Sequence, residues 1–438
     1  MPSLRALYRS PASGLDRRVT VLSLTSLVMM LGSSIISPVL PLYARDFGVG
    51  YASAGLLVSA FALGRLLFDY AGGALADRLS TRLLAAAGAI ISALSAFLSA
   101  RATSFTALVL YRSLEGLGSA FYVVTIMALF ARTVPAERMG KAMSFYQSMV
   151  LLGVSFGPTI GGIAAEQTGS LRAPFFLMAG LDLAVAVVTL AVLRPDGEPS
   201  AHVTPPRPAL REVFAHLSGR AFAYVLLLTF FVFAIRAGTR SNLIPLFGRE
   251  HGGLGASAIG FILSASAFAN FAVLWHAGSL LDRLGRQRVA LPTLVATAAI
   301  SAVFAMSPGF SNLLVASTLL GVALGYLAPA PAAMVADLTP RALMGPVIGI
   351  YRTAGDLGLL LGPVALGATA TAFGFEAAFF AAAVVSLAIF AVGAAVPETL
   401  QRGRSFSVTN GDEPQNEERP RKQTNGDNRQ ERPRDPRD

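Results

Sequence analysis

The stretch "GGALADRLSTR", from Gly72 to Arg82, places a short charged turn between two long apolar runs. A closely similar stretch, "AGSLLDRLGRQR", runs from Ala277 to Arg288. The Asp-Arg pairs of the two stretches lie 205 residues apart. Recurrence of a long motif at a fixed spacing predicts that the chain contains two copies of one structural unit.

Other landmarks repeat at nearly the same spacing. Gly157-Pro158 recurs as Gly362-Pro363, again 205 residues later. The stretch "PLYARD", which begins at Pro41, recurs as "PLFGRE" from Pro245, at an offset of 204 residues. This near-constant offset indicates duplication of a unit of six helices. Because six is an even number, both copies would enter the membrane from the same side, as parallel repeats.

The composition is that of a membrane protein. Of the 438 residues, 54% are hydrophobic and 14% are charged, whereas soluble domains carry about 25% charged residues. Apolar segments long enough to cross a bilayer recur along the chain. We therefore expect an all-α membrane protein, with twelve transmembrane helices in two pseudo-symmetric bundles of six. The expected spans are 19–43, 51–76, 83–101, 105–131, 140–166, 173–193, 221–247, 256–281, 288–308, 311–337, 344–370 and 375–396.

The polar segments divide the chain into five parts. Residues 1–18 form a cytoplasmic N-terminal segment, 19–193 the first bundle and 221–398 the second bundle. The Pro-rich interval 194–220 is a cytoplasmic linker with a short surface helix. Residues 399–438 carry mixed charges and few apolar side chains, so we expect a disordered cytoplasmic tail.

The net charge of +10 predicts topology rather than binding to nucleic acid. The N-terminus, the even-numbered loops and the linker carry 17 Lys or Arg residues, and the odd-numbered loops carry four. By the positive-inside rule, both termini and the linker lie in the cytoplasm. We expect a monomer in the plasma or inner membrane whose partners are the lipid bilayer, protons and a small-molecule substrate, and not nucleic acid.

Several function classes find no support in the sequence. Cysteine is absent and the four histidines are scattered, so no metal cluster is expected. No nucleophile–base pair and no phosphate-binding loop is evident. We therefore expect neither an enzyme nor an ATP-driven pump, and no cofactor, with a proton gradient as the source of energy.

Three motifs carry a resemblance to a known family. The two charged turns resemble the Gly-xxx-Asp-Arg-x-Gly-x-Arg loop of the Major Facilitator Superfamily, with Ser80 where the first copy usually has Gly. "RSLEGLG", from Arg112, is similar to the superfamily's helix-4 pattern, with Glu115 in place of the usual Gln. "GVSFGPTIGG", from Gly153 to Gly162, resembles the helix-5 pattern of drug/proton antiporters. The resemblance implies alternating access and, more narrowly, the twelve-helix drug/proton antiporter family.

The resemblance also implies roles for the motif residues. In the outward-facing state, the charged turns would latch the two halves together on the cytoplasmic side, with Asp77 facing the helix N-terminus near Met344. The gating residues are then Gly73, Asp77, Arg78, Arg82, Gly278, Asp282, Arg283, Gly285 and Arg288. The helix-5 motif would form a smooth face for close helix packing between the halves. Its residues are Gly153, Gly157, Pro158, Gly161 and Gly162.

Ionisable residues within the spans are functional candidates, because each costs at least ~2.5–3.5 kcal/mol at mid-bilayer. These charges do not recur between the two halves, unlike the gating motif. Their spacing forms pairs at i,i+4 or i,i+3, which would partly neutralise themselves along one helix face. The pairs, which are candidates for proton coupling, are Arg65 and Asp69, Arg112 and Glu115, and Arg352 and Asp356. The alternative is that the pairs are structural and hold helices in register.

Three further ionisable residues lie in the spans, namely Asp182, Arg236 and Arg240. For Asp182 a structural or cavity-edge role is favoured. In the superfamily, helices 1, 4, 7 and 10 line the central cavity, and the resemblance places candidates for substrate contact there. They are Ser34, Ser37, Tyr122, Thr125, Phe233, Arg236, Asn242 and Tyr326.

These features favour export of a small organic or drug-like molecule in exchange for protons. The alternative is a proton symporter or uniporter for a sugar, an organic acid or another small metabolite. Arg236 and Arg352 would suit an anionic ligand, and the absence of an acid from residues 19–43 favours this alternative. A third hypothesis is a membrane receptor or scaffold on the same fold that transports nothing.

Overall fold

The computed structural model describes residues 17–76, 80–192, 210–306, 309–340 and 343–399. Side chains are described for only part of these ranges, and those of 68–76 are among the exceptions. Asp77, Arg78 and the side chain of Asp69 therefore lie outside the described residues. The same holds for most of the expected linker and for nearly all of the expected terminal segments.

All the described elements are helices. In the first half they are α1 (Arg17–Ile35), α2 (Leu40–Arg45), α3 (Tyr51–Ala76), α4 (Thr81–Ala100), α5 (Phe105–Thr133), α6 (Ala136–Thr168) and α7 (Ala173–Val192). A short helix, α8 (Leu210–Leu217), follows. In the second half they are α9 (Arg220–Ile235), η2 (Arg236–Leu243), α10 (Ile244–Glu250), α11 (Ala256–Leu284), α12 (Arg286–Phe304), α13 (Phe310–Leu327), α14 (Pro329–Leu338), α15 (Met344–Phe373) and α16 (Phe375–Ala394).

Three of the expected spans are present but are not uniform α-helices. The first span breaks between α1 and α2, where Pro38 lacks the N–H that a continuous helix needs. The seventh passes from α9 into η2, a π-helix, and then into α10, which has Pro245 in its first turn. The tenth divides into α13 and α14 at Pro329. The break in the first span and the π-helix in the seventh place irregular backbone next to the cavity described below.

The helices are those of a membrane protein. Within the described residues, 11 helical segments are long and apolar enough to cross a bilayer. The described side chains of α3 form a shorter apolar stretch, Tyr51–Leu67, and its helical backbone continues to Ala76. With α3 included, the architecture is the expected twelve-helix fold.

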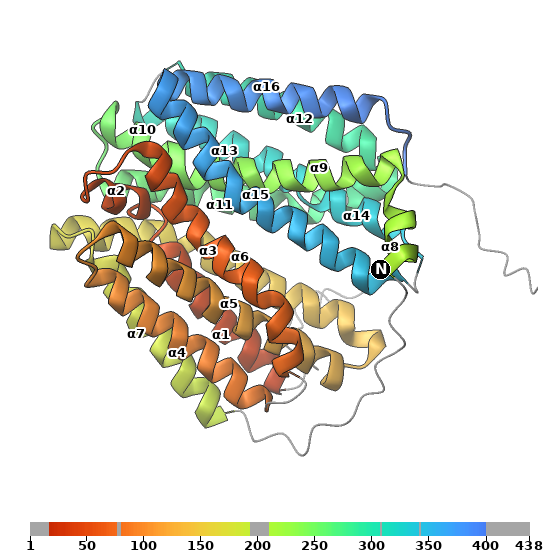
Figure 1. Ribbon diagram of the computed structural model, residues 1–438, viewed down its shortest axis with the longest axis horizontal. Helices are drawn as coiled ribbons and strands as arrows, with labels where there is room; N and C mark the ends of the chain where they lie inside the picture. The colour runs from red at the N-terminus through yellow and green to blue at the C-terminus, as the bar shows by residue number, and fades with distance from the viewer. Residues whose placement is uncertain (1–16, 77–79, 193–209, 307–308, 341–342, 400–438) are drawn as a thin grey trace, which may run out of the picture. The chain divides into compact units, whose positions relative to one another are not determined.

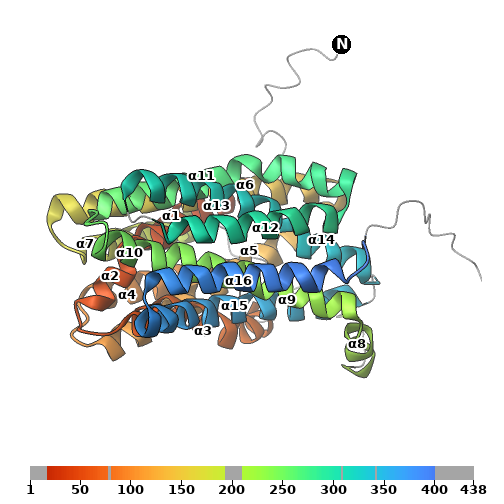
Figure 2. The same ribbon diagram turned by 90° about the horizontal axis from the view of Figure 1, so that it is seen from above.

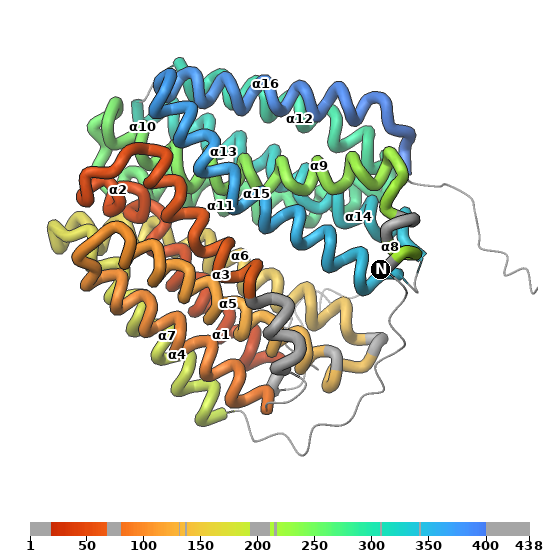
Figure 3. Tube along the Cα trace, in the orientation of Figure 1, coloured from red at the N-terminus to blue at the C-terminus, as the bar shows by residue number. Residues whose placement is uncertain are grey.

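The two halves pack through two helix pairs. Helix α3 of the first half lies along α15 of the second, and α6 lies along α11 (Figures 1 and 2). The connections that follow α2, α4, α6, α10, α12 and α15 share one end of the helices, which we name the odd-loop face. The opposite end, where α3, α5, α11 and α14 finish, is the even-loop face, and the chain can be followed between the two in Figure 3.

Glycine allows the two helix pairs to approach closely. A Cβ added to Gly55 on α3 would collide with the carbonyl oxygen of Pro363 on α15. A Cβ added to Gly260 on α11 would collide in the same way with the carbonyl oxygen of Pro158 on α6. Gly55 and Gly260 are 205 residues apart, as are Pro158 and Pro363. The duplication therefore builds the same glycine–carbonyl contact twice.

A second contact repeats in the same way. Gly162 on α6 faces the carbonyl oxygen of Ala256, and Gly367 on α15 faces that of Tyr51. Both members of this contact again follow the 205-residue offset. Together, the four glycine–carbonyl contacts of this paragraph and the preceding one form what we name the seam. The sequence motif included Pro158 and Gly162 but missed the glycines at 55, 260 and 367.

The other glycines of the helix-5 motif face a different helix. Gly153, Gly157 and Gly161 all pack against α1 of their own bundle, where an added Cβ would collide with backbone or with Ser34. The expectation that the whole motif forms contacts between halves is therefore correct only for Pro158 and Gly162. Helix α6 therefore has small residues on two faces, one packed against α1 and the other against α11.

The seam predicts that one methyl group added to a seam glycine lowers the stability of the protein. Gly260→Ala should lower the thermal unfolding midpoint in detergent, because overpacking of a close contact costs about 1–3 kcal/mol. The matched control is Gly180→Ala on α7, where an added Cβ meets no atom within 4 Å. The control should leave the midpoint unchanged or raise it, because Ala favours helix over Gly by about 1 kcal/mol. Equal midpoints for the two variants would contradict the seam.

Candidate functional site

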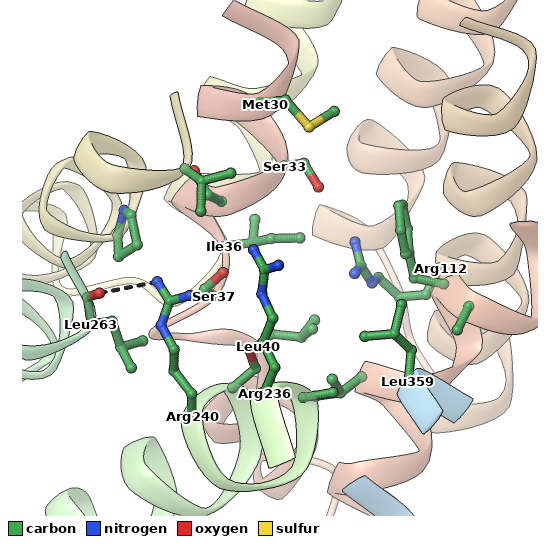
Figure 4. Close-up of a pocket in the computed structure, with 18 of the residues that line it drawn as sticks. Met30, Ser33, Ile36, Ser37, Leu40, Arg112, Arg236, Arg240, Leu263 and Leu359 are labelled. Atoms are coloured by element: carbon green, nitrogen blue, oxygen red, sulfur yellow. Dashed lines mark hydrogen bonds between the residues drawn. The ribbon is translucent and has the colours of Figure 1, made fainter. Parts of the chain in front are cut away.

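A central cavity of about 280 Å³ lies between the two bundles. Its walls come from α1, α3, α5 and α6 of the first half and from α9, η2, α11 and α15 of the second. Figure 4 shows the guanidinium groups of Arg236 and Arg240 extending from η2 toward α1, with Arg112 on the opposite side. A cavity shared by both halves is the place where relative motion of the bundles would change access.

Four of the residues predicted to face the cavity lie in its wall. They are Ser34, Ser37, Phe233 and Arg236. Ser37 lies in the break between α1 and α2, and Arg236 begins η2. The interrupted helices therefore bring polar side chains to the cavity.

The other four predicted cavity residues lie elsewhere, which corrects the prediction. Tyr122 is buried and donates to Thr25 Oγ1 at 2.6 Å, inside the first bundle. Thr125 is also buried and donates to the backbone of its own helix. The two remaining residues hold other positions in the second bundle. Asn242 is buried and bonds the carbonyl oxygen of Pro363, and Tyr326 bonds His276.

The physical reason is helix rotation. The sequence shows which membrane-spanning helix a residue belongs to. It does not show which face of that helix turns toward the cavity. On α5 the cavity face carries Arg112, whereas Tyr122 turns toward α1. Only the packing of neighbouring helices decides this direction.

The Arg112–Glu115 pair has the geometry expected from its i,i+3 spacing. The two side chains form an ion pair that is almost fully buried. Glu115 also accepts a hydrogen bond from Ser33 at 3.5 Å, and the Arg112 guanidinium lies 5.4 Å from the ring centre of Phe61. Ser33 and Arg112 both line the cavity. Glu115 thus contacts two side chains of the cavity wall, and only these separate it from a ligand in the cavity.

The pairing of Asp356 differs from the prediction. Its carboxylate lies 3.7 Å from Arg65 Nη2, on α3 of the other bundle. Arg352, its expected partner on α15, is exposed and lies outside the cavity wall. Helices α3 and α15 are neighbours in the seam. Arg65, on the opposite side of the interface, is therefore closer to Asp356 than Arg352, which lies one turn away on the same helix. The ion pair joins the two bundles, which a pair along one helix could not do.

The pseudo-symmetric position has no equivalent ion pair. The offset relates Arg65 to Asn270 and Asp356 to Leu151. Near Leu151, a second cavity of about 440 Å³ opens between α6 and α11, with the exposed Trp275 in its wall. Helices α6 and α11 therefore touch at the seam and separate toward the even-loop face.

Asp182 occupies a structural position. It is fully buried and accepts a hydrogen bond from Ser92 Oγ at 2.6 Å. It packs between α1 and α4, beside Gly32, and lies outside the central cavity. The position supports the structural role favoured from the sequence.

Polar contacts join the bundles at the odd-loop face. Arg45 donates to Glu250 at 3.1 Å across the two halves. Glu166, at the end of α6, accepts from the backbone N–H of Ser257 at 3.0 Å, in the first turn of α11. Together with the seam, these contacts join the two halves at the odd-loop side, around a further cavity of about 480 Å³.

The sequence profile of the Major Facilitator Superfamily matches residues 22–312 and 236–416. The chain belongs to the Major Facilitator Superfamily. It is 27% identical over 354 residues to the multi-drug resistance efflux pump PmrA of Streptococcus pneumoniae, covering 80% of this chain and 88% of that one. It is 22% identical over 377 residues to MJ1560, an uncharacterized MFS-type transporter of Methanocaldococcus jannaschii, covering 86% and 97%.

The fold comparison agrees with this family. A crystal structure of a bacterial homologue of the human lysosomal transporter Spinster matches with a TM-score of 0.71 and 17% identity. The match covers 86% of this chain and 95% of that one. The chain is therefore a multi-pass membrane transporter, and the family and fold are not those of enzymes.

The superfamily's charged turn has a clear structure in its second copy. Arg286, which the motif did not include, is its centre. Its guanidinium bonds Asp337 at 2.8 and 3.2 Å and Asp282 at 2.9 Å. Arg283 and Arg288 are exposed. In this structure Asp282 therefore contacts its own bundle, and the latch between halves in the outward-facing state stays a prediction for this copy.

Glu398 completes the turn. Its carboxylate accepts the backbone N–H groups of Arg286 and Gln287 at 2.8 and 3.0 Å, at the start of α12. A carboxylate at this end of a helix satisfies free N–H groups and opposes the helix dipole. Gly285 has φ +114 and lies against Glu398, so both its backbone and its lack of Cβ are needed. Gly278, by contrast, has open space around it.

The first copy of the turn is described only in part. Its Asp77 and Arg78 lie outside the described residues, and Gly73 is described only as helical backbone of α3. Arg82 is partly buried in the first turn of α4. The latch between Asp77 and the start of α15 stays a prediction.

The second turn yields a test with a matched control. Arg286→Gln should lower the stability of the protein by about 1–3 kcal/mol, because it leaves the carboxylate of Asp337, whose side chain is 20% exposed, without its cation. Arg288→Gln, two residues away and exposed, should change the stability by less than about 0.5 kcal/mol. Thermal unfolding in detergent measures both, and equal effects would contradict the central role of Arg286.

Proposed function

We propose that the chain is a secondary transporter that exports a small organic molecule in exchange for protons, by alternating access. The observation that carries this proposal is the central cavity. Both bundles line it, and arginines that line it pair with two acids, Glu115 and Asp356. In a rocking mechanism, such a cavity binds the substrate and such acids bind the proton.

The charge bias of the loops orients the protein in this proposal. With the even-loop face in the cytoplasm, both termini and the linker are cytoplasmic and the protein lies in the plasma or inner membrane. The Arg45–Glu250 pair is then at the extracellular surface, and the seam lies toward that side within the membrane. The cavity between α6 and α11 lies on the cytoplasmic side. This arrangement corresponds to the state that receives substrate from the cytoplasm.

The ion pairs supply a physical route for coupling. When Glu115 gains a proton, its attraction for Arg112 falls, and the guanidinium becomes available to the cavity. When Asp356 gains a proton, the link to Arg65 between the bundles weakens in the same way. Protonation thus changes both the charge of the site and the contact between halves, and Arg112 keeps the coupling role that the resemblance implies.

The relatives support export. PmrA is named a multi-drug resistance efflux pump and is similar over most of its length. The proposal needs no cofactor besides the proton gradient, and it takes the chain to act as a monomer. A cavity shared by both bundles favours transport over a receptor or scaffold role.

Uptake of a small metabolite by symport or uniport is the second candidate. The observation in its favour is the pair of arginines on η2, which would suit an anionic metabolite. Direction separates the two candidates, because exchange moves substrate against the proton flow and symport moves it along with the flow.

Proteoliposomes that contain a pH-sensitive dye test the proposal. The added compounds are ethidium, norfloxacin and 1-naphthoate, which are cationic, zwitterionic and anionic. At least one should exchange for protons across vesicles of the wild-type protein. Glu115→Gln and Asp356→Asn should each lower this coupled flux by at least about tenfold, since neither side chain can carry the proton.

The control variant is Asp182→Asn, which keeps the shape and the acceptor for Ser92. It should retain coupled flux and its pH dependence. Flux that is equal with and without a pH gradient, or equal in the wild type and both acid variants, would contradict proton coupling. Absence of flux for all three compounds would contradict the proposed export.

A further inference from the structure

We propose that the transported molecule is an amphipathic organic anion whose acidic group lies between Arg236 and Arg240. The inference rests on the proposed function, since it takes the central cavity to be the transport site. It adds the chemical class of the substrate and the residues that select it.

The two arginines share a distinctive piece of backbone. Arg236 and Arg240 both lie on η2, a π-helix of 8 residues, and both line the central cavity. Figure 4 shows both guanidinium groups reaching from η2 into the space beneath α1. Short π-helical segments occur often at functional sites. A guanidinium group binds carboxylate, sulfonate and phosphate through parallel hydrogen bonds.

The described residues leave these cations without an anionic partner. The Arg240 guanidinium donates to the carbonyl oxygen of Leu263 at 3.1 Å. Its buried Nε has no hydrogen-bond partner among the residues that the structure describes. Within the same described residues, Arg236 forms no ion pair and no side-chain hydrogen bond. Two like charges one turn apart repel each other, and both are costly in a membrane.

The other charges of the cavity are already balanced. Arg112 pairs with Glu115, and Arg65 pairs with Asp356. These four side chains cancel in pairs, so the two arginines of η2 leave an excess of two positive charges among the described side chains. An anionic ligand supplies the missing charge, whereas a cationic ligand would add to the repulsion.

The rest of the cavity suits an apolar body. Phe61, Phe233, Leu263 and Leu359 line it together with Met30. The hydroxyl groups of Ser37 and Ser241 lie in the same wall and can donate to acidic oxygens. The wall thus divides into a basic part on η2 and an apolar part, which matches an acid on an aromatic or aliphatic body.

A series of compounds on one aromatic scaffold tests the charge. The probes are 1-naphthoate, 1-naphthalenesulfonate and 1-naphthyl phosphate as anions, 1-naphthamide as the neutral match and 1-naphthylmethylammonium as the cation. Binding to the purified full-length protein is measured by calorimetry and by the shift in thermal midpoint, without a pH gradient. At least one anion should bind at least about tenfold more tightly than the amide and the cation.

Single substitutions assign the site. Arg236→Gln and Arg240→Gln should each weaken binding of that anion by at least about tenfold, and Arg236→Lys by less, because Lys keeps the charge but not the fork. Arg352→Gln, on the exposed arginine outside the cavity, should bind like the wild type. Without ligand, both Gln variants should have unfolding midpoints equal to or above the wild type, since each removes an unpaired cation. This readout excludes misfolding as the cause of lost binding.

Three results would overturn the inference. They are a flat response to all three anions, equal binding of amide and anion, and wild-type anion affinity in both Gln variants. Failure of the proposed function gives a different pattern. If 1-naphthoate binds through Arg236 and Arg240 but none of ethidium, norfloxacin and 1-naphthoate drives proton flux, the anion site stands and the proposed function fails. If ethidium drives proton flux while no anion binds, the reverse holds.

Discussion

The close approach of two helix pairs across the bundle interface is the constraint on which the rest of the structure depends. In lipid, apolar side chains gain little by leaving solvent, so helices associate through packing and short contacts. Here that packing is glycine against carbonyl oxygen, with two such contacts between α3 and α15 and two between α6 and α11. A seam of small residues holds the halves together without interlocking side chains.

The charges inside the membrane depend on this seam. It places Arg65 beside Asp356 across the interface, and it leaves an apolar opening at the pseudo-symmetric position between α6 and α11. The duplication therefore supplies a symmetric scaffold, and the ionisable residues break its symmetry. Interrupted helices complete the site, because the break after α1 and the π-helix η2 turn Ser37 and Arg236 into the cavity. In the proposed mechanism, the symmetric packing allows the two bundles to move, and the asymmetric charges select the substrate and couple its transport to protons.

Much of this architecture could be predicted from the sequence, because apolar length and a constant offset are properties of the chain itself. The Arg112–Glu115 pair was also predictable, since i,i+3 spacing fixes the two side chains on one face. The partner of Asp356 was not, because it comes from another helix whose position depends on packing. The rotation of α5, which turns Tyr122 away from the cavity, escaped prediction for the same reason. Pro38 and Pro245 signalled the interrupted helices, although the long apolar runs concealed the breaks.

The most direct test of alternating access about the seam is a pair of distances measured by double electron–electron resonance. The chain has no cysteine, so labels can be attached without altering native thiols. Gln167→Cys with Arg249→Cys spans the odd-loop face, and Ser144→Cys with Ser279→Cys spans the opening between α6 and α11. On changing pH or adding 1-naphthoate, the account predicts opposite changes, with the first distance lengthening in the molecules in which the second shortens. Distances that both stay fixed, or that change in the same direction, would contradict it.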